Sequence, residues 1–375
     1  MGSCAPARTI LQQADLTPPM YAPAKIDDVS ASFKSLEQAI YGDFTAPTKF
    51  DLRTSDIVSS NFLNGKATVE RRIYDVSHGQ PHQVFEVIMV SPNDHMNAPI
   101  ILSQNFSSNS AVISVNGHTP LSNKKSSMGL LGPIFTFFFG RHIVEPPLED
   151  IIDRGYSFVA MHPPDYLPDH AGEATDQLNE ILGNSHERPG ALMIWASLST
   201  SLADDLKAES PRRPIIAFGH SRYGKTALLS AAYAKSIDGI IAHQSGTAGA
   251  SLMRDETGES LGQIIKIYPH WLKLSASQYS NAPRTLTTDS HALLAQLSPK
   301  PVLLGNARRD VWSDPEGTFQ AAKWAANNTS QSFSAARLDD FKPEDDIAIW
   351  TRPGTHGVVK EDWPVFLEFL DAHFK

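Results

Sequence analysis

The sequence predicts an α/β fold, with a mostly parallel central sheet that helices cover on both faces. From about residue 148 onward, short apolar segments alternate with longer segments of helical periodicity, which is typical of strands joined by crossover helices. Hydrophobic residues make up 41% and charged residues 19% of the 375 residues, as in an ordinary globular protein. No apolar run reaches the roughly 18 residues that a membrane span requires.

The elements expected before and after residue 148 differ in character. The first three strands are separated only by turn-forming residues, so we expect consecutive hairpin strands there. The expected strands are 67–77, 82–91, 98–106, 156–162, 214–219, 237–244, 300–307 and 346–350. The expected helices lie near 148–156 and at 191–209, 225–234, 317–328 and 361–374.

Residues 31–375 are expected to form a single domain, because neither a linker nor an internal repeat divides them. Residues 1–30 are rich in proline and alanine and are predicted to be an extended N-terminal arm. The segment at about 246–299 shows helical pieces and no clear strand. We therefore expect it to be an insertion that lies over the sheet.

Charge and cysteine usage limit the classes of protein to be considered. The net charge of -9 provides no basic surface for nucleic acid, so nucleic-acid binding is not expected. Cys4 is the single cysteine of the chain, which excludes an internal disulfide and a cysteine metal cluster. No export signal is visible, and Cys4 is a candidate for the lipid-bearing cysteine of a processed lipoprotein.

The stretch GHSRYGKT at 219–226 fits two unrelated motifs. It satisfies G-x-x-x-x-G-K-[ST], the phosphate-binding P-loop, and it also places Ser221 between an apolar strand and a helix, as in the nucleophile elbow of a hydrolase. A P-loop turns backbone N–H groups onto phosphate and favours small residues, whereas this stretch contains Arg222 and Tyr223. No later strand supplies a distinct magnesium-binding aspartate. The phosphate-binding alternative is therefore remote.

The hydrolase interpretation requires a histidine to accept the serine proton and a carboxylate to orient that histidine. In such folds the chain order is serine, acid, histidine, each on a loop after a successive strand. Asp310 follows the strand at 300–307, and His356 lies between glycines after the strand at 346–350. Asp314 is a second candidate for the acid, although it precedes a proline and a helix that it could instead cap. An N-cap role is likewise the alternative for Ser221.

The elbow departs from the common spacing G-x-S-x-G, because Tyr223 stands where the second glycine is expected. The residue after the nucleophile normally gives its backbone N–H to the oxyanion hole. Here that residue is Arg222, whose guanidinium could add charge-assisted donors. The alternative for Arg222 is a pairing with a surface acid.

Several segments together resemble the glucuronoyl esterases of carbohydrate esterase family 15, bacterial branch. They are GHSRYGKTALLSAA, HQSGTAGASLMRDETGESL, YPHWL, DSHALLAQLSPKPVLL and ARRDVWSDPEG, and the resemblance covers roughly 215–320 and resumes at RPGTHG. It implies a serine hydrolase of α/β-hydrolase fold that needs no metal or cofactor. It also implies a substrate, the ester between (4-O-methyl-)glucuronic acid on xylan and a lignin alcohol.

Carried over residue by residue, the resemblance implies Ser221 as nucleophile, His356 as base and Arg222 as an oxyanion contributor. It further implies that Lys225 and Glu259 bind sugar hydroxyls and that Trp312 lines the sugar site; for Lys225 a solvated helix lysine is the alternative. Many members of the family carry the triad acid immediately before Ser-Gly, where this chain has Gln244. An amide cannot serve as the carboxylate, so the acid is expected to be Asp310, with Asp314 still open.

These observations favour a serine carboxylic-ester hydrolase with a uronate ester as substrate. A general carboxylesterase or acetyl esterase of the same fold remains an alternative. A non-catalytic carbohydrate-binding relative is another, because of Gln244. We expect a monomer that is secreted or periplasmic, with a carbohydrate ester as its partner and no membrane span.

Overall fold

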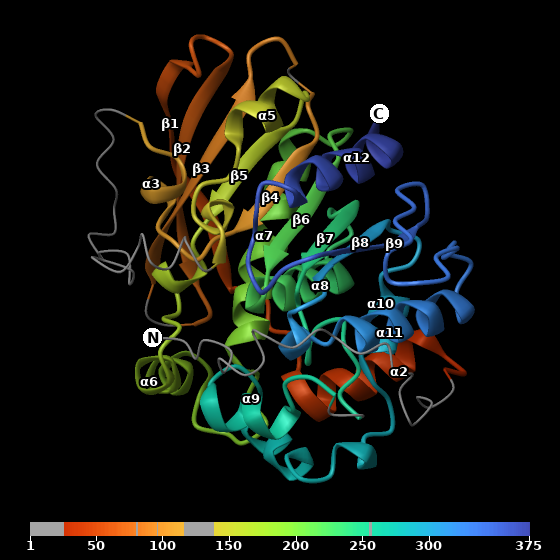
Figure 1. Cartoon of the computed structure of the whole chain (residues 1–375). Helices are drawn as coiled ribbons and strands as arrows, with labels where there is room; N and C mark the ends of the chain where they lie inside the picture. Colours follow the sequence, from red (N-terminus) through yellow and green to blue (C-terminus); the bar gives the residue numbers. More distant parts are fainter. Residues whose placement is uncertain (1–25, 80–81, 96, 116–138, 255–256) are drawn as a thin grey trace.

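The computed structural model describes residues 26–79, 82–95, 97–115, 139–254 and 257–375. Its nine-stranded sheet has the order β1-β2-β3-β5-β4-β6-β7-β8-β9 and crosses the molecule from upper left to right in Figure 1. The strands are β1 (Lys49–Phe62), β2 (Ala67–Ser77), β3 (Gln83–Pro92), β4 (Ile100–Gln104), β5 (Ser157–Met161), β6 (Ile215–His220), β7 (Gly239–His243), β8 (Val302–Ala307) and β9 (Ile347–Arg352). The α-helices are α2 (Val29–Leu36), α3 (Asn109–Val112), α5 (Leu148–Asp153), α6 (Ala171–Leu182), α7 (Ala191–Glu209), α8 (Arg222–Tyr233), α9 (Leu261–Ile267), α10 (Ser290–Gln296), α11 (Pro315–Asn327) and α12 (Asp362–Phe374).

The sheet has an antiparallel part and a parallel part. Strands β1, β2 and β3 pair antiparallel, and β3 pairs antiparallel with β5. From β5 through β4, β6, β7 and β8 to β9 every pairing is parallel. The carboxyl ends of these six strands therefore meet at one edge, which is where open α/β sheets bind their ligands.

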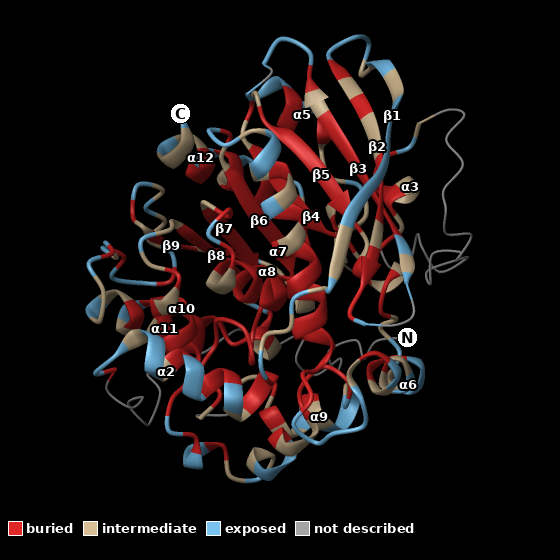
Figure 2. Cartoon of the chain, turned by 180° about the vertical axis from the view of Figure 1, so that it is seen from behind, coloured by how far each residue is buried: buried red, intermediate tan, exposed pale blue. Residues whose placement is uncertain are grey.

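Alternate residues of the parallel strands pack into two separate cores, one on each face of the sheet. In β6, Ile215 and Ala217 belong to the core beneath α7 and α8, whereas Ile216 and Phe218 belong to the core beneath α5 and α12. Figure 2 shows these strands buried in the middle of the molecule. The predicted α/β architecture, with helices on both faces, is confirmed.

Two expectations for the N-terminal half are wrong. The strand β1 was not expected, and it is exposed along most of its length (Figure 2), so its sequence lacks the apolar alternation that marks a half-buried strand. Strand β4 does not continue the hairpin after β3 but inserts between β5 and β6. All five residues of β4 are buried, and a short apolar run does not indicate which neighbours a strand pairs with.

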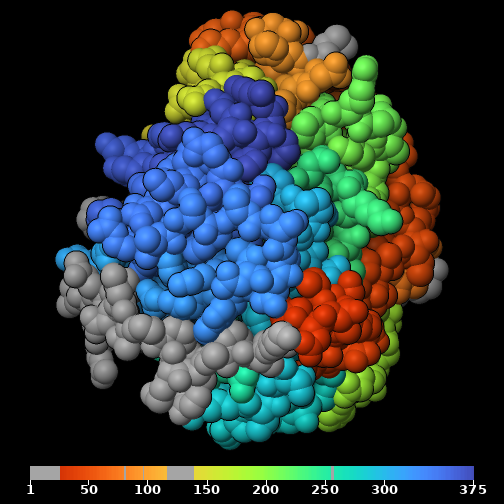
Figure 3. All heavy atoms as spheres, turned by 90° about the vertical axis from the view of Figure 1, so that its right-hand side faces the viewer, coloured from red at the N-terminus to blue at the C-terminus, as the bar shows by residue number. Residues whose placement is uncertain are grey.

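The remaining segments pack around this sheet. Helix α2 contacts α10, and Figure 3 shows this N-terminal part of the chain in red beside the C-terminal part in blue. The segment 246–299, predicted as an insertion, includes α9 and α10. Most of the predicted N-terminal arm, with Cys4, lies outside the described residues. None of the helices in the described ranges has the length and apolar character needed to span a bilayer.

Candidate active site

Ser221 occupies a strained turn between β6 and α8, at the carboxyl edge of the sheet. Its φ of 56° and ψ of -123° are unusual for a residue with a side chain, and its N–H donates to the carbonyl oxygen of His243 at 2.8 Å. Among the described residues its hydroxyl makes no capping hydrogen bond to α8. The N-cap alternative is thus not what the structure shows, and backbone strain of this kind clusters at functional sites.

The close approach of strand and helix at the elbow depends on Gly219 and Gly224. A Cβ atom on Gly219 would lie 2.0 Å from the carbonyl oxygen of Tyr223, and one on Gly224 would lie 3.0 Å from the Cβ of Ser245. Tyr223 itself is buried, and its ring packs 4.8 Å from that of Phe106 between centroids. The glycine that allows this close approach usually stands two residues after the serine, whereas here it is Gly224, three residues after Ser221.

The buried Asp310 and the partly buried His356 form a pair next to this elbow. The Nδ1 atom of His356 lies 2.7 Å from Oδ2 of Asp310, so Nδ1 carries the proton and Nε2 is left as the basic nitrogen. The His356 ring centroid lies 4.6 Å from that of His220, the residue before Ser221. Burial alone would raise the pKa of Asp310, but the charge and hydrogen bond of His356 outweigh it and lower the pKa below 3.8.

Asp314, the other candidate acid, lies in a different environment. Its Oδ1 accepts from the N–H of Gly317 at 3.0 Å, which caps α11. Its Oδ2 accepts from the hydroxyls of Ser251 at 2.8 Å and Thr257 at 2.6 Å. The capping alternative therefore describes Asp314, and Asp310 is the carboxylate that contacts His356.

Arg222 is held by a partly buried acid and by aromatic rings. Its Nη1 forms an ion pair with Asp169, which also accepts from His270 Nε2 and Trp271 Nε1, both at 2.9 Å. The guanidinium carbon lies 4.9 Å from the centroid of Trp271. Within the described part of the chain, the buried Nε of Arg222 has no hydrogen-bond partner. An acid does pair with Arg222, as the alternative held, but it is largely buried rather than on the surface.

Lys225 is buried, so the solvated-lysine alternative is wrong. Its Nζ donates to the carbonyl oxygens of Ser245 and, at 2.6 Å, Thr247. Burial lowers its pKa to about 8, against the opposing charge of Glu259. An ammonium engaged with backbone carbonyls argues against the P-loop alternative, in which this group would have to face a phosphate.

Glu259 and Trp312 lie side by side at the same edge. The N–H of Glu259 donates to the carbonyl oxygen of Trp312 at 2.8 Å. The Glu259 side chain is 7% exposed, and burial raises its pKa against the positive charge of Lys225. The structure thus places Glu259 and Trp312 at the same end of the sheet as the other residues that the sequence predicted for the site.

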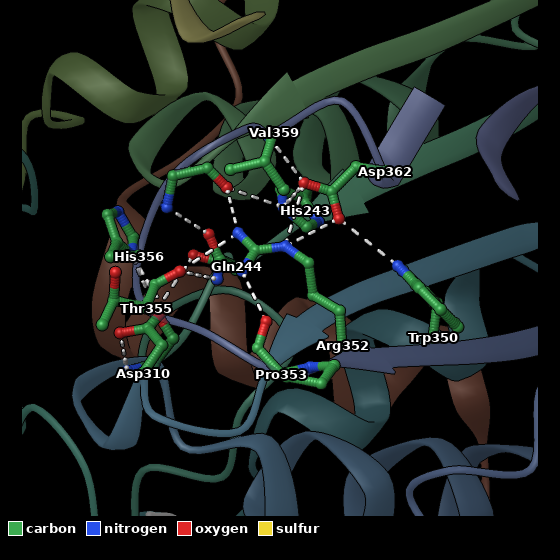
Figure 4. A network of polar contacts seen from close by, with 12 residues as sticks. His243, Gln244, Asp310, Trp350, Arg352, Pro353, Thr355, His356, Val359 and Asp362 are labelled. Atoms are coloured by element: carbon green, nitrogen blue, oxygen red, sulfur yellow. Dashed lines mark hydrogen bonds and ion pairs between the residues drawn. The ribbon is translucent and has the colours of Figure 1, made fainter. Parts of the chain in front are cut away.

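A buried network that the sequence did not indicate lies behind His356 (Figure 4). The carboxylate of Asp362, at the start of α12, accepts from Arg352 Nε at 2.9 Å and from the N–H of Val359 at 2.9 Å. It also lies 3.5 Å from His243 Nε2. Asp169, Arg352 and Asp362 went unpredicted because each contacts residues distant in sequence, Arg222, Gly357 and His243 among them, in ways that no local pattern indicates.

Replacing Asp362 by alanine is expected to lower the free energy of unfolding by about 3–5 kcal/mol, because Arg352 would stay buried without its counter-ion. Urea unfolding would measure the loss. The control is Asp371→Ala in the same helix, whose partly exposed carboxylate pairs with Arg154 and Lys375 and accepts from the hydroxyl of Tyr156, and whose loss should cost less because water reaches this site. Equal losses in the two variants would contradict the expected importance of the buried pair.

Acid should weaken the same pair in a defined direction. Burial would raise the pKa of Asp362, but His243 and Arg352 outweigh it and lower the pKa below 3.8. A lowered carboxyl pKa contributes stability that is complete above 3.8 and is lost as the pH falls through the lower native value.

Comparisons with known proteins connect this geometry to a family. A family model described as glucuronyl esterase, fungi, matches residues 159–332. Carbohydrate esterase MZ0003, from an unknown prokaryotic organism, is 34% identical over 193 residues, which are 49% of this chain and 44% of that protein. The chain therefore matches less than half the length of that curated relative.

Two solved structures resemble the whole fold. A glucuronoyl esterase from Solibacter usitatus has a TM-score of 0.80 at 22% identity, covering 96% of this chain and 100% of that one. A promiscuous CE15 esterase from a marine bacterial metagenome has a TM-score of 0.79 at 22% identity, covering 93% and 92% of the two chains. In sequence over residues 159–332 and in fold over nearly its full length, the chain is thus similar to the glucuronoyl esterases of carbohydrate esterase family 15, which confirms the resemblance and the α/β-hydrolase fold predicted from its sequence.

Proposed function

We propose that this chain is a serine carboxylic-ester hydrolase that cleaves esters of glucuronic acid. The observation that carries the proposal is the contact between Asp310 Oδ2 and His356 Nδ1, 2.7 Å apart, beside the strained elbow of Ser221. A strained serine, a histidine with its Nδ1 occupied by a carboxylate, and a helix N-terminus at the same point are the parts that acyl transfer requires.

The reaction proceeds in two steps. Ser221 Oγ attacks the ester carbonyl while His356 Nε2 takes the hydroxyl proton, and Asp310 stabilises the imidazolium that results. His356 then gives that proton to the departing alcohol as the carbonyl–alkoxy bond breaks. Water then attacks the acyl-enzyme as His356 takes its proton, and His356 returns that proton to Ser221 Oγ as the carbonyl–Oγ bond breaks and the uronic acid leaves.

The negative oxygen of each tetrahedral intermediate lies near the first turn of α8. The backbone N–H of Arg222 opens this helix, and the first amides of a helix lack intrahelical acceptors. The Arg222 guanidinium adds a positive charge next to this turn. Because Asp169 and the ring of Trp271 hold the guanidinium in place, little reorganisation is needed when the charge develops.

A uronate is favoured as the acyl group by the polar side chains next to this centre. Glu259 and Trp312 provide a carboxylate and an indole face, which suit sugar hydroxyls and a sugar's C–H surface. The ammonium of Lys225 uses two of its three N–H donors on backbone carbonyls, which leaves the third for a hydroxyl. The names of the related esterases point the same way. The similar esterase from a marine metagenome is described as promiscuous, which favours a second candidate function, that of a carboxylesterase with a broad substrate range.

The substrate assignment is tested with Glu259→Gln. We expect kcat/KM for benzyl glucuronate to fall by about 10- to 100-fold, since a hydrogen bond to a charged group contributes about 1.5–3 kcal/mol. Hydrolysis of 4-nitrophenyl acetate, which has no sugar, should change by less than about threefold in the same variant. Initial rates on both esters give the comparison.

Glu316→Gln is the control, because Glu316 is a partly buried carboxylate on α11 that pairs with Gln320 at 2.8 Å rather than with the groups at the elbow. If Glu259→Gln lowers both activities equally, the broad carboxylesterase is favoured. If the wild type hydrolyses neither ester, the proposed function is wrong.

A further inference from the structure

Gln244 lies at the end of β7 and is anchored on both sides through its backbone. Its N–H donates to the carbonyl oxygen of Gly305 at 2.7 Å, and its carbonyl oxygen accepts from the hydroxyl of Ser313 at 3.3 Å. It is 1% exposed and has a φ of 49°. A residue held so tightly presents its side chain in one direction.

The side-chain amide of Gln244 bonds to the backbone on both sides of His356 (Figure 4). Its Oε1 accepts from the N–H of Gly357 at 2.8 Å, and its Nε2 donates to the carbonyl oxygen of Thr355 at 3.3 Å. A backbone N–H can only donate and a carbonyl can only accept, so these partners fix which end of the amide is which. None of the hydrogen bonds found for this amide reaches the His356 ring within the described structure.

Two residues of the buried network, Arg352 and His243, also bond to backbone carbonyl oxygens of this loop. Arg352 Nη2 donates to the carbonyl oxygens of Thr355 at 3.1 Å and Gly357 at 2.9 Å. His243 Nε2 lies 3.0 Å from the carbonyl oxygen of Gly357. The backbone on both sides of His356 is therefore held by residues that end or follow β7 and β9. Among these contacts, Gln244 is the residue that accepts from the N–H of Gly357 and also donates to the carbonyl of Thr355.

We propose that Gln244 is a positioning residue for His356, because its amide accepts from Gly357 and donates to Thr355 at once, which an ionised carboxylate cannot do. The inference rests on the proposed function, in which His356 is the base. An ionised carboxylate at this position would keep the first hydrogen bond but would place a negative oxygen against the carbonyl of Thr355. Displacing a catalytic group by about 1 Å costs up to about 100-fold in rate.

The titratable and charged groups around this position come from six elements. His356 lies on the loop that Gln244 supports, Asp310 follows β8, Arg352 ends β9, Asp362 begins α12, and His220 and His243 end β6 and β7. Arg352 would favour an ionised glutamate here, whereas Asp310, Asp362 and the carbonyl of Thr355 would oppose it. A protonated glutamate has a hydroxyl that can donate to Thr355 and so imitates the amide.

The test compares Gln244→Met and Gln244→Glu with wild type, using benzyl glucuronate from about pH 5 to about pH 9. Gln244→Met, which removes both hydrogen bonds, should lower kcat by about 10- to 100-fold and change KM by less than about twofold. Gln244→Glu should be impaired at high pH and should approach wild type as the pH falls and its carboxyl gains a proton. The control is Gln331→Met. Gln331 is a buried glutamine whose Nε2 donates to the backbone carbonyl of Lys300 rather than to the His356 loop, so this substitution should leave kcat unchanged.

A double variant separates positioning from acid function. If the carboxyl that Gln244→Glu introduces could replace the triad acid, this substitution would restore activity to Asp310→Asn; we expect no restoration. Hydrogen exchange of the peptide that covers residues 353–360 adds a measurement independent of activity, and Gln244→Met should speed exchange there.

Three results would overturn the inference. They are a Gln244→Met variant with the kcat of wild type, a Gln244→Glu variant as active as wild type at high pH, and restoration of Asp310→Asn by Gln244→Glu. Each is distinct from failure of the proposed function, which would appear as wild-type activity that does not depend on Ser221.

Discussion

Replacement of Ser221 by alanine is expected to lower kcat for a glucuronate ester by about 10⁶-fold, the loss typical of removing the nucleophile from a serine hydrolase. Without Oγ no acyl-enzyme forms, and His356 has no hydroxyl proton to accept. The oxyanion donors at the start of α8 would remain, so a residual rate above that of water alone should persist. Product release, followed over hours at high enzyme concentration, measures the change.

Ser230→Ala is the matched control for this substitution. Ser230 lies on the same helix and is fully buried, but its hydroxyl bonds to the backbone carbonyl of Thr226 rather than facing the elbow. We expect nearly wild-type activity from it. A Ser221→Ala variant that kept more than about a tenth of wild-type kcat would show that another group is the nucleophile.

Asp310→Asn is expected to lower kcat by about 10⁴-fold near neutral pH. An asparagine can present its NH₂ group to His356, which would favour the tautomer with its proton on Nε2 and leave no base for Ser221. Because the pKa of Asp310 is lowered below 3.8, the wild-type carboxylate stays ionised through mildly acidic pH. The deficit of the variant should therefore be nearly constant from about pH 5 upward, which a pH series of kcat would measure.

Asp314→Asn should behave differently, although it removes a carboxylate only four residues away. Asp314 caps α11 and accepts from two hydroxyls, so its loss should cost about 0.5–2 kcal/mol of stability. Most of the wild-type kcat should remain at a temperature where the variant is folded. If Asp314→Asn lost as much activity as Asp310→Asn, the assignment of the acid would be wrong.

The sequence predicted the parallel half of the sheet well because each of its strands is a short apolar run bounded by turn residues. Ser221, Asp310 and His356 each follow such a strand, and parallel strands bring their carboxyl ends together. Local pattern and chain order therefore sufficed to name three residues that the fold gathers, separated by as much as 135 positions along the chain.

Other features could not be predicted because they depend on tertiary contacts. Lys225 follows the elbow, and no local pattern indicated that carbonyl oxygens about twenty residues later would engage its ammonium. Asp169 gives no local sign that it will pair with Arg222, 53 positions away. From the sequence, Gln244 was notable only because it stands where many relatives have a carboxylate. Its hydrogen bonds to Thr355 and Gly357 depend on how the fold places β7 next to the loop that follows β9.

The two glycines of the elbow bear on how such enzymes are recognised in genome sequences. A text search for G-x-S-x-G passes over this chain, because the residue after Arg222 is tyrosine. What the turn demands is space between the strand and the helix, and Gly224 supplies it one position later, against Ser245 and the carbonyl oxygen of Gly219. A search that allows G-x-S-x-x-G after a short apolar run would retrieve chains of this kind. It would also prevent their assignment to the nucleotide-binding proteins on the basis of the lysine that follows the second glycine.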